Sequence, residues 1–359
     1  MCPDNGGTFG YPGFAVLRSI LMTTNPLIAI TMGDPAGIGP EIIAKVFESG
    51  EVLVRCRPFV VGNADVIKKV VADLKLALDV RTIGAAARSA PAAGRVEVLH
   101  QDNVDMEKHA WGRPNAASGK AVVDYITLAA GLARQGTVDA IVTAPINKEL
   151  MNAAGFDYAG HTELFASLTD TKDYGMMFVG GGLRLILVTI HHAIKDVPSL
   201  ITKDRVLRMI RLAHRAVRDF GIAAPRIGVA ALNPHASEGG LFGNEEWSEI
   251  LPAVLEARGE GINASDPLPA DTLFYKARHG HYDIVVAMYH DQGLGPLKMV
   301  AFGSSVNVTV GLPIVRTSVD HGTAFDIAGK GVADPTSLRE AILLAAEMAA
   351  HRSSREVRP

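Results

Sequence analysis

The chain has few cysteines, few aromatic residues and no excess of basic charge. Only Cys2 and Cys56 occur in 359 residues, which excludes a disulfide framework and a thiolate-rich structural metal site and fits a reducing compartment. The 35 Lys and Arg residues are balanced by 38 Asp and Glu residues, so no positive stripe for nucleic acid is predicted. No apolar run reaches the roughly 20 residues that span a bilayer. We therefore expect a cytoplasmic protein with neither a nucleic-acid nor a membrane partner.

The N-terminal segment shows no pattern typical of a folded element. Residues 1–21 are glycine-rich and irregular, and they lack an Ala-x-Ala cleavage site, which argues against a signal peptide. Met22 lies just before the first predicted strand and is an alternative start of translation. We expect residues 1–25 to form a disordered or dispensable extension.

Apolar runs alternate with amphipathic stretches along the rest of the chain. Continuous apolar runs indicate strands covered on both faces, and we predict them at 27–32, 58–61, 140–144, 183–190, 226–232 and 284–289. Helices are predicted at 118–135, 203–220, 245–258 and 335–351. This alternation predicts an α/β fold with a largely parallel sheet. We expect two lobes, one made of residues 26–159 plus 304–352 and the other of residues 160–303, followed by a tail at 353–359.

Three histidines occur in separate motifs, each after an apolar run. They are His191 in Thr-Ile-His-His, His235 in Asn-Pro-His-Ala and His290 in Tyr-His-Asp-Gln-Gly. Three imidazoles at strand ends can bind one divalent cation and leave positions open, which is typical of catalytic sites. Nitrogen ligands favour Zn²⁺, with Mg²⁺, Mn²⁺ and Co²⁺ as alternatives, and Asp291 could orient a ligating histidine. A single such histidine would more often be a hydrogen-bonded core residue, whereas three motifs favour a metal.

Two loops are rich in glycine. The first, residues 31–41, follows a strand and opens a helix, and it contains Gly33, Asp34, Gly37 and Gly39. It either binds an anion through free N–H groups or only turns the chain, and its spacing leaves both interpretations open. It does not match the Gly-x-Gly-x-x-Gly fingerprint of an ordinary dinucleotide site.

The second loop, His321-Gly-Thr-Ala-Phe-Asp-Ile-Ala-Gly-Lys-Gly331, adds a family resemblance. Together the loops resemble those of isocitrate and isopropylmalate dehydrogenases. The resemblance implies the two-lobed fold of those enzymes, with mostly parallel sheets and an interlobe cleft. It also implies NAD or NADP binding, with these candidates: Gly33, Asp34, Gly37, Gly39, His321, Gly322 and Asp326. Asp326 could instead cap a helix.

Further motifs occur in a fixed order along the chain. They are Thr143-Ala-Pro-Ile-Asn-Lys148, Gly160-His-Thr-Glu163, Asn233-Pro-His-Ala236, Tyr289-His-Asp-Gln-Gly293 and Gly311-Leu-Pro-Ile-Val-Arg-Thr-Ser-Val-Asp-His321. Together they resemble the 4-hydroxythreonine-4-phosphate dehydrogenase family of pyridoxal-phosphate biosynthesis. The resemblance implies metal binding by His191, His235 and His290, and substrate binding, chiefly of a phosphate, by His161, Thr162, Lys298, Asn307 and Arg316. It also implies a homodimer whose active site is completed by the partner subunit, with the first lobe on the cofactor side and the second binding the metal and dimerising.

Several of these residues have simpler interpretations. His191 is followed by His192, and strand alternation would let only one of them serve; alignment on Thr-x-His selects His191. Thr162 could cap a helix, and Lys298 could be an ordinary surface lysine. Lys148 is either an acid or base near the reacting hydroxyl or an exposed lysine at a helix end.

The implied reaction is the NAD(P)-dependent oxidation of a secondary alcohol. The substrate would be a phosphorylated hydroxy acid such as 4-phosphohydroxy-L-threonine, and the β-keto acid product would lose CO₂. A D-threonate or D-erythronate 4-phosphate dehydrogenase and a terephthalate-type cis-dihydrodiol dehydrogenase are alternatives within the family. A phosphate acyltransferase and a noncatalytic metal-binding module are alternatives from other classes.

Overall fold

The computed structural model describes residues 25–356 and contains one sheet of twelve strands. Their order is β3-β4-β2-β1-β5-β12-β11-β6-β7-β10-β8-β9. The strands are β1 (Leu27–Thr31), β2 (Arg57–Gly62), β3 (Asp79–Ile83), β4 (Arg95–His100), β5 (Ala140–Thr143), β6 (Gly175–Gly180), β7 (Leu183–Leu187), β8 (Ile227–Ala230), β9 (Ala264–Leu268), β10 (Ile284–Ala287), β11 (Val306–Val310) and β12 (Val315–Val319). The extension predicted at 1–25 lies almost entirely outside the described residues.

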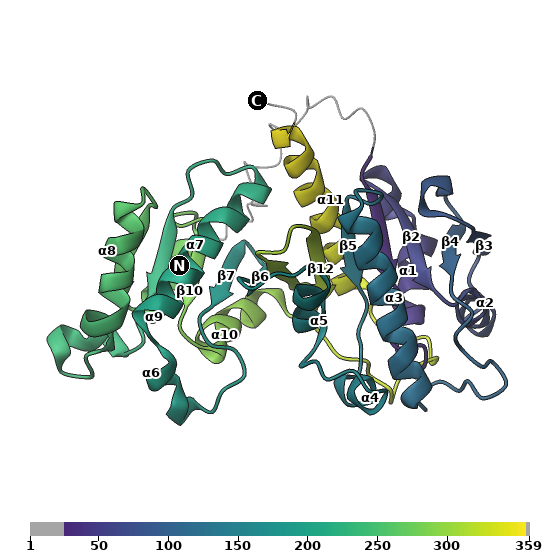
Figure 1. Ribbon diagram of the computed structural model, residues 1–359, viewed down its shortest axis with the longest axis horizontal. Coiled ribbons are helices and arrows are strands. Elements are labelled where there is room, and N and C mark those ends of the chain that lie inside the picture. Colours follow the sequence, from purple (N-terminus) through teal and green to yellow (C-terminus); the bar gives the residue numbers. More distant parts are fainter. Residues whose placement is uncertain (1–24, 357–359) are drawn as a thin grey trace, which may run out of the picture.

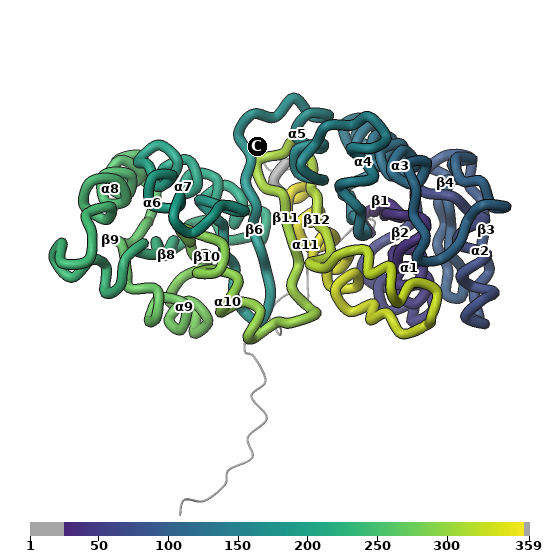
Figure 2. The backbone as a smooth tube through the Cα atoms, turned by 90° about the horizontal axis from the view of Figure 1, so that it is seen from below, coloured from purple at the N-terminus to yellow at the C-terminus, as the bar shows by residue number. Residues whose placement is uncertain are grey.

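The sheet is parallel except near its middle. The neighbours β3, β4, β2, β1, β5 and β12 are parallel to one another, and so are β7, β10, β8 and β9. Strand β11 is antiparallel to both β12 and β6, and β6 is antiparallel to β7. Two halves therefore flank a waist, and β6, β11 and β12 run between them (Figure 2). The predicted α/β class with a mostly parallel sheet is confirmed. The exact lobe boundaries stay a prediction.

Helices cover both halves of this sheet (Figure 1). They are α1 (Gly39–Ser49), α2 (Ala64–Asp73), α3 (Ala116–Arg134), α4 (Lys148–Ala153), α5 (His161–Leu168), α6 (Val197–Leu200), α7 (Lys203–Val217), α8 (Leu251–Gly259), α9 (Ala270–Arg278), α10 (His290–Ala301) and α11 (Thr336–Glu356). The buried core is rich in Ile, Val, Leu and Ala, as expected for strands covered on both faces. None of the described helices is long and apolar enough to cross a membrane.

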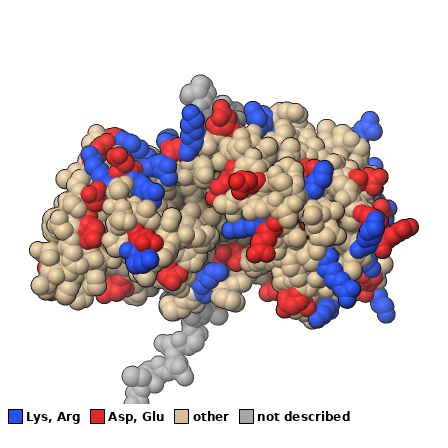
Figure 3. Space-filling view, turned by 60° about the horizontal axis from the view of Figure 1, so that its bottom comes forward, with Lys and Arg blue, Asp and Glu red and all other residues tan. Residues whose placement is uncertain are grey.

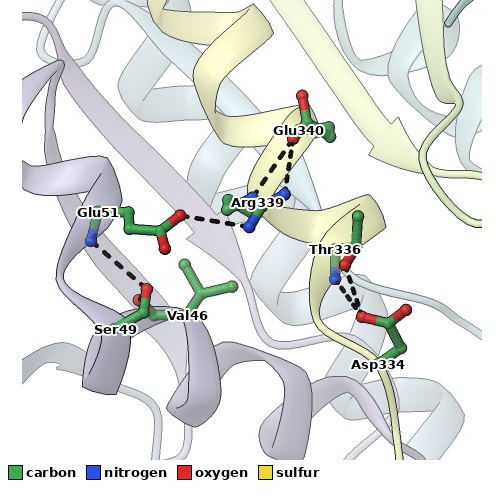
Figure 4. Close-up of polar contacts among 7 residues, drawn as sticks. All are labelled: Val46, Ser49, Glu51, Asp334, Thr336, Arg339 and Glu340. Atoms are coloured by element: carbon green, nitrogen blue, oxygen red, sulfur yellow. Dashed lines mark hydrogen bonds and ion pairs between the residues drawn. The ribbon is translucent and has the colours of Figure 1, made fainter. Parts of the chain in front are cut away.

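Helix α11 is longer than predicted and packs against β12 and β5. Its N-terminus is held by Asp334, which accepts hydrogen bonds from the Thr336 N–H at 2.9 Å and the Thr336 hydroxyl at 2.6 Å, and Arg339 links it to Glu51 near α1 (Figure 4). The predicted end at residue 351 is wrong, because α11 continues to Glu356. In this added part Arg352 donates to Asp219, which follows α7 in the other half of the molecule, at 2.9 Å. The tail predicted at 353–359 thus begins inside the helix.

Charges of both signs are mixed on the surface. On the face seen in Figure 3, Lys and Arg side chains are interspersed with Asp and Glu. This distribution agrees with the balanced composition and shows no continuous positive stripe on that face.

Glu41 fastens the first helix to the late glycine loop. Its carboxylate is fully buried and lies 2.9 Å from the Lys45 ammonium. It also accepts hydrogen bonds from the N–H groups of Gly331 at 3.3 Å and Ala333 at 2.8 Å. Glu41 lies in the first turn of α1, where a negative charge complements the helix N-terminus. In the structure it also determines where residues 331–333 lie.

Glu41→Ala is expected to lower the free energy of unfolding by about 3 kcal/mol, because it leaves two N–H groups without their acceptor and removes the carboxylate beside the Lys45 ammonium, which keeps only its hydrogen bonds to the Gly331 and Ala333 carbonyls. Urea denaturation checks this value. Lys68→Ala is the matched control, since the exposed pair of Lys68 and Asp65 should contribute less than about 1 kcal/mol. Equal losses in the two variants would contradict the role given to Glu41.

Candidate active site

The two glycine-rich loops lie side by side. The Ile38 N–H donates to the Thr323 carbonyl at 3.0 Å, which joins the first loop to the late one. Gly33 has a φ of 72°, and a side chain there would collide with the Pro145 carbonyl, so this turn requires glycine. The structure therefore brings together two loops that lie near opposite ends of the described chain.

The donors of the first loop are largely used within the protein. The Asp34 N–H donates to the Pro145 carbonyl at 2.9 Å, the Gly37 N–H to the Asp34 carbonyl at 3.1 Å, and the Ile38 N–H to Thr323. Few N–H groups remain for an anion, and this geometry favours the interpretation of the loop as a turn. Cofactor binding by Gly33, Asp34, Gly37 and Gly39 stays a prediction.

The late loop is more open to a ligand. His321, Gly322 and Asp326 are exposed. No helix follows Asp326 directly, because α11 begins only at Thr336. The alternative that Asp326 caps a helix is therefore wrong, and its carboxylate is available for a ligand.

Asp34 is a buried carboxyl group at the start of the first loop. Its Oδ1 accepts a hydrogen bond from the Ala36 N–H at 2.9 Å, while its Oδ2 is buried without a partner in the described part of the chain. Burial raises the pKa of Asp34 from 3.8 to about 6, against the effect of the Ala36 hydrogen bond. The folded state therefore binds this proton more tightly than the unfolded chain does.

This shift predicts a pH dependence of stability. The contribution of Asp34 is fully present below pH 3.8 and is lost as the pH rises through about 6. Asp34→Asn should remove this dependence. The free energy of unfolding of the variant minus that of the parent should therefore rise by about 3 kcal/mol from about pH 4 to about pH 7.5. Denaturant titrations at both pH values test this. Asp65→Asn should show the opposite trend, because the Lys68 hydrogen bond lowers the pKa of Asp65; a gap that does not change with pH would contradict the prediction.

The three histidines follow three neighbouring parallel strands. His191 lies beyond β7, His235 beyond β8 and His290 beyond β10, and the sheet order there is β7-β10-β8. The carboxyl ends of adjacent parallel strands meet at one edge of the sheet. The His191 and His290 rings lie 5.6 Å apart between centroids. Two of the predicted ligands are therefore close together.

Carboxylates hold one nitrogen of two of these rings. Asp291 Oδ1 lies 2.7 Å from His290 Nδ1, and Glu238 Oε2 lies 3.2 Å from His235 Nδ1. A hydrogen bond at Nδ1 fixes the neutral tautomer whose Nε2 lone pair can bind a metal. This donor set fits a divalent cation that prefers imidazole nitrogen.

The structure does not bring His235 into the same cluster. Among residues 25–356 no three His, Cys, Asp or Glu side chains are placed to hold one metal ion. His235 lies in a turn, η5 (Pro234–Gly240), where four consecutive non-glycine residues, 235–238, have φ values between 45° and 63°. This left-handed backbone costs about 1–2 kcal/mol per residue. Convergence of all three rings stays a prediction.

The argument from strand alternation does not apply to His191 and His192. Strand β7 ends at Leu187, so both histidines lie in an exposed loop. The ring contact with His290 is what favours His191 as the ligand. Burial, followed by the charge of Lys148, lowers the pKa of His191, which favours the neutral ring that a metal requires.

A ladder of polar side chains lies on one face of β11 and β12. Asn307 pairs with Ser318 in the antiparallel register, and the same register places Thr309 opposite Arg316 and Ser305 opposite Asp320. Alternate residues of a strand share a face, so these three pairs lie on the same side of the sheet. Two of the predicted substrate residues, Asn307 and Arg316, therefore belong to this ladder.

Lys298 meets one end of this ladder. Its ammonium lies 3.2 Å from Asp320 Oδ2, which also accepts a 2.6 Å hydrogen bond from the Ser305 hydroxyl. Lys298 is therefore more than an unpaired surface lysine, because its charge is held at the end of β12.

Helix α5 covers the other end of the ladder. Thr162 Oγ1 lies 3.3 Å from Thr309 Oγ1, and the Arg316 guanidinium lies 5.6 Å from the centre of the Phe165 ring. Gly160 is the N-cap of α5 and His161 its first residue. The alternative that Thr162 caps the helix is therefore wrong, since Thr162 lies inside it.

Three predicted substrate residues carry buried polar atoms without a hydrogen-bond partner in the described structure. They are His161 Nε2, Asn307 Oδ1 and Arg316 Nε. Burial lowers the pKa of Arg316 to about 9. Burial, followed by the charges of Arg316 and Lys148, holds the pKa of His161 well below 6.5. Buried polar atoms are normally paired. An anionic group could accept from Arg316 Nε–H, and from His161 Nε2 when that nitrogen carries the proton, whereas Asn307 Oδ1 needs a donor such as a hydroxyl group.

Two charged residues act electrostatically on both this set and His191. Lys148, the exposed first residue of α4, lowers the pKa of both His161 and His191, after the effect of burial. Glu163 acts in the opposite direction on Arg316 and His191. Glu163 was not predicted as a site residue from the sequence, although it stands next to Thr162 in the Gly160–Glu163 motif.

A hollow of about 310 Å³ lies elsewhere, between α7, α11 and the turn that joins β11 to β12. Its lining includes Thr309 and the start of the Gly311–His321 motif, but none of the predicted ligands of metal, substrate or cofactor. A search for hollows alone would therefore not have found the predicted site.

Known proteins share this fold and these motifs. Residues 54–345 match the family model described as Pyridoxal phosphate biosynthetic protein PdxA. A 4-hydroxythreonine-4-phosphate dehydrogenase of Geobacter metallireducens is 49% identical over 92% of this chain and 98% of its own. A D-threonate 4-phosphate dehydrogenase of Cupriavidus necator is 46% identical over 91% and 98%. The crystal structure of 4-hydroxythreonine-4-phosphate dehydrogenase from Klebsiella pneumoniae, 42% identical, superposes with a TM-score of 0.86 over 90% of this chain and 100% of that one.

These similarities extend over nearly the whole described chain and confirm the resemblance drawn from the ordered motifs. A family model that matches 54–345 and relatives of nearly half-identical sequence establish the family without reference to any single residue. The chain therefore belongs to the family of PdxA, the pyridoxal phosphate biosynthetic proteins.

Proposed function

We propose that the protein is a metal-dependent NAD(P) dehydrogenase that oxidises the secondary alcohol of a small phosphorylated hydroxy acid. The observation that carries this proposal is the set of unpaired buried atoms on His161, Asn307 and Arg316, three residues that the family resemblance assigns to substrate. The candidate substrates are those named for the relatives, 4-phosphohydroxy-L-threonine and D-threonate 4-phosphate.

The polar ladder and α5 supply the groups that a phosphate needs. Arg316 offers a planar fork of N–H donors, and Lys298 adds a point charge. His161 is neutral because its pKa is held low, so its ring can donate one hydrogen bond without adding charge. The Asn307 amide can turn its nitrogen toward the same ligand. We propose that these residues bind the phosphate end of the substrate.

The alcohol would then lie toward the histidines. A divalent cation held by His191, His235 and His290 would lower the pKa of the substrate hydroxyl and stabilise the negative charge that develops on its oxygen. Asp291 holds Nδ1 of His290 and thereby orients that ring. Lys148, close enough to shift the pKa of His191, is the group that we propose exchanges protons with the substrate.

A nicotinamide cofactor would accept the hydride. Of the candidate residues, His321, Gly322 and Asp326 in the late loop are exposed and fit its adenosine half, with Asp326 as an acceptor for hydroxyl groups. When the alcohol is β to a carboxylate, the keto product loses CO₂ and the carbon left behind takes up a proton, which Lys148 could supply.

We also propose that the protein is a homodimer that shares its active sites. Apolar side chains close to His235 are unusually exposed: Leu241 by 72%, Phe242 by 47% and Trp247 by 53%. Exposed apolar clusters of this kind favour a protein partner. Packing of a second subunit there would also act on the left-handed turn that carries His235.

The test is a panel of substrates assayed by the absorbance of NADH. Purified protein is given NAD⁺ or NADP⁺ with 4-phosphohydroxy-L-threonine, D-threonate 4-phosphate, D-erythronate 4-phosphate or a cis-dihydrodiol, each before and after treatment with a chelator. We expect turnover of a phosphorylated substrate that is lost on chelation and restored by Zn²⁺, Mn²⁺, Co²⁺ or Mg²⁺. Acetyl transfer from acetyl phosphate to coenzyme A without NADH formation would instead establish a phosphate acyltransferase.

A further inference from the structure

We propose that Thr143 and Thr309 are positioning residues that aim the Arg316 guanidinium and the Thr162 hydroxyl at the substrate phosphate. This inference rests on the proposed function, because it assumes that Arg316 binds the phosphate. Neither threonine belongs to the set that the family resemblance assigned to substrate, metal or cofactor.

The two threonines hold Arg316 from the strands on either side of it. Arg316 lies on β12, which stands between β5 and β11 in the sheet. Its Nη2 donates to Thr143 Oγ1 on β5 at 2.5 Å, and its Nη1 donates to Thr309 Oγ1 on β11 at 2.9 Å. Both terminal nitrogens are thus fastened across the sheet, which fixes the plane of the guanidinium.

The remaining donors of Arg316 are left for a ligand. A guanidinium has five N–H groups, and its Nε has no partner in residues 25–356. Phe165 covers one side of the guanidinium, with 5.6 Å between Cζ and the ring centre. Because Arg316 is only 2% exposed, water offers little alternative to the two threonines.

The protons of the hydroxyl groups follow from the direction of the arginine bonds. Arg316 can only donate, so Thr309 Oγ1 accepts from it, and the Thr309 proton is free to point at Thr162 Oγ1, 3.3 Å away. The Thr162 proton is then available to a phosphate oxygen. The arginine thereby sets the donor direction of a hydroxyl group on a different element, α5.

The same reasoning applies on the other side. Thr143 Oγ1 accepts from Arg316 and donates to Ser318 Oγ at 2.9 Å, and Ser318 Oγ donates to the Thr143 carbonyl at 3.2 Å. The hydroxyl protons of Thr143 and Ser318 therefore both have an acceptor. Valine at position 143 or 309 has nearly the same shape as threonine but no acceptor, so it would leave one buried Arg316 nitrogen without its hydrogen bond.

The experiment compares Thr143→Val and Thr309→Val with Thr143→Ser and Thr309→Ser in the metal-loaded enzyme, with its phosphorylated substrate. We expect each valine variant to raise KM about ten-fold with kcat within about two-fold of the parent, and each serine variant to restore KM. In a protein that already carries Arg316→Ala, the valine substitutions should raise KM no further.

Thr317→Val is the matched control. Thr317 lies on the same strand and is buried, but its hydroxyl donates to the Ala341 carbonyl of α11 at 2.8 Å, on the opposite face. The Thr317→Val variant should be less stable than the parent protein, and its KM should be unchanged. The positioning role is overturned if Arg316→Ala raises KM while both valine variants leave it unmoved, or if Thr317→Val raises KM as much as they do. An unchanged KM in Arg316→Ala itself would instead overturn the phosphate role of Arg316, and the inference with it.

Discussion

Arg316→Ala is expected to raise the KM for the phosphorylated substrate about 100-fold, with a much smaller change in kcat. Charge-assisted hydrogen bonds to a phosphate contribute about 1.5–3 kcal/mol each, and a loss of about 3 kcal/mol corresponds to roughly two powers of ten in affinity. The phosphate is not itself the group that reacts, so most of this loss should appear in binding. Steady-state kinetics over a wide range of substrate concentration measures the two constants separately.

The control for this prediction is Arg184→Ala. Arg184 is also an arginine packed on a phenylalanine, with its guanidinium 4.7 Å from the Phe220 ring, and burial lowers its pKa as well. It belongs to β7 and has no place in the polar ladder. We expect this variant to lose stability and keep its KM. Arg316→Lys should fall between the parent and Arg316→Ala, because lysine keeps the charge but lacks the planar fork. If KM in Arg316→Ala equals that of the parent, the phosphate lies elsewhere.

The strands that sequence patterns predict well are those buried on both faces. Strands β1, β2, β5 and β10 appear within two residues of the predicted ends, because a continuous apolar run has few other ways to be buried. Strands β3, β4, β6, β9 and β12 were not predicted, and of these β3 and β9 lie at the edges of the sheet. Asp79–Ile83 is mostly exposed and polar, and β9 contains Pro267, which is typical of sheet edges. Edge strands are determined by their pairing, which leaves little trace in local composition.

Motifs located the chemically active residues but not their partners. The sequence marked Arg316 and Thr162, yet it could not show that Thr143 and Thr309 would flank Arg316, because this requires the order of β5, β12 and β11 in the sheet. One local signal existed. Asn307 and Thr309 alternate with the valines of β11, and this period of two predicts a polar strand face there. No such alternation marks β12, because Thr317 between Arg316 and Ser318 is also polar.

The histidine pair shows how a small error in a strand boundary changes an argument. Residues 183–190 are apolar enough to predict one strand, and a strand reaching residue 190 would place His191 and His192 on opposite faces. In the structure β7 ends at Leu187, and after it the Val188 N–H donates to the Ala287 carbonyl of β10 and the Thr189 N–H to the Met288 carbonyl just beyond β10. The choice of His191 therefore rests on its ring contact with His290, a contact between elements that no local pattern contains.

Removing any one of the three predicted metal ligands is expected to have the largest effect on turnover. His191→Ala, His235→Ala and His290→Ala should each lose bound divalent metal and lower kcat on the order of 10³-fold, because Lewis-acid stabilisation of the developing negative charge is worth several kcal/mol. Metal content by mass spectrometry and the rate of NADH formation are measured on the same samples. Binding of NAD⁺, followed by calorimetry, should stay near the parent value, since the late loop does not depend on these rings.

His192→Ala is the matched control for this series. His192 is adjacent to His191 and also exposed, but it has no ring contact with His290, so the variant should keep both metal and rate. Loss of metal in His192→Ala with metal retained in His191→Ala would exchange their roles. His235→Ala is the most discriminating variant, because the structure places this ring in a left-handed turn apart from the other two. If it retains metal and rate, the cation is held by His191 and His290 with other partners, and the turn around His235 needs a different explanation. If it loses both, the turn must rearrange when the site assembles, and its strained backbone marks the part of the chain that moves.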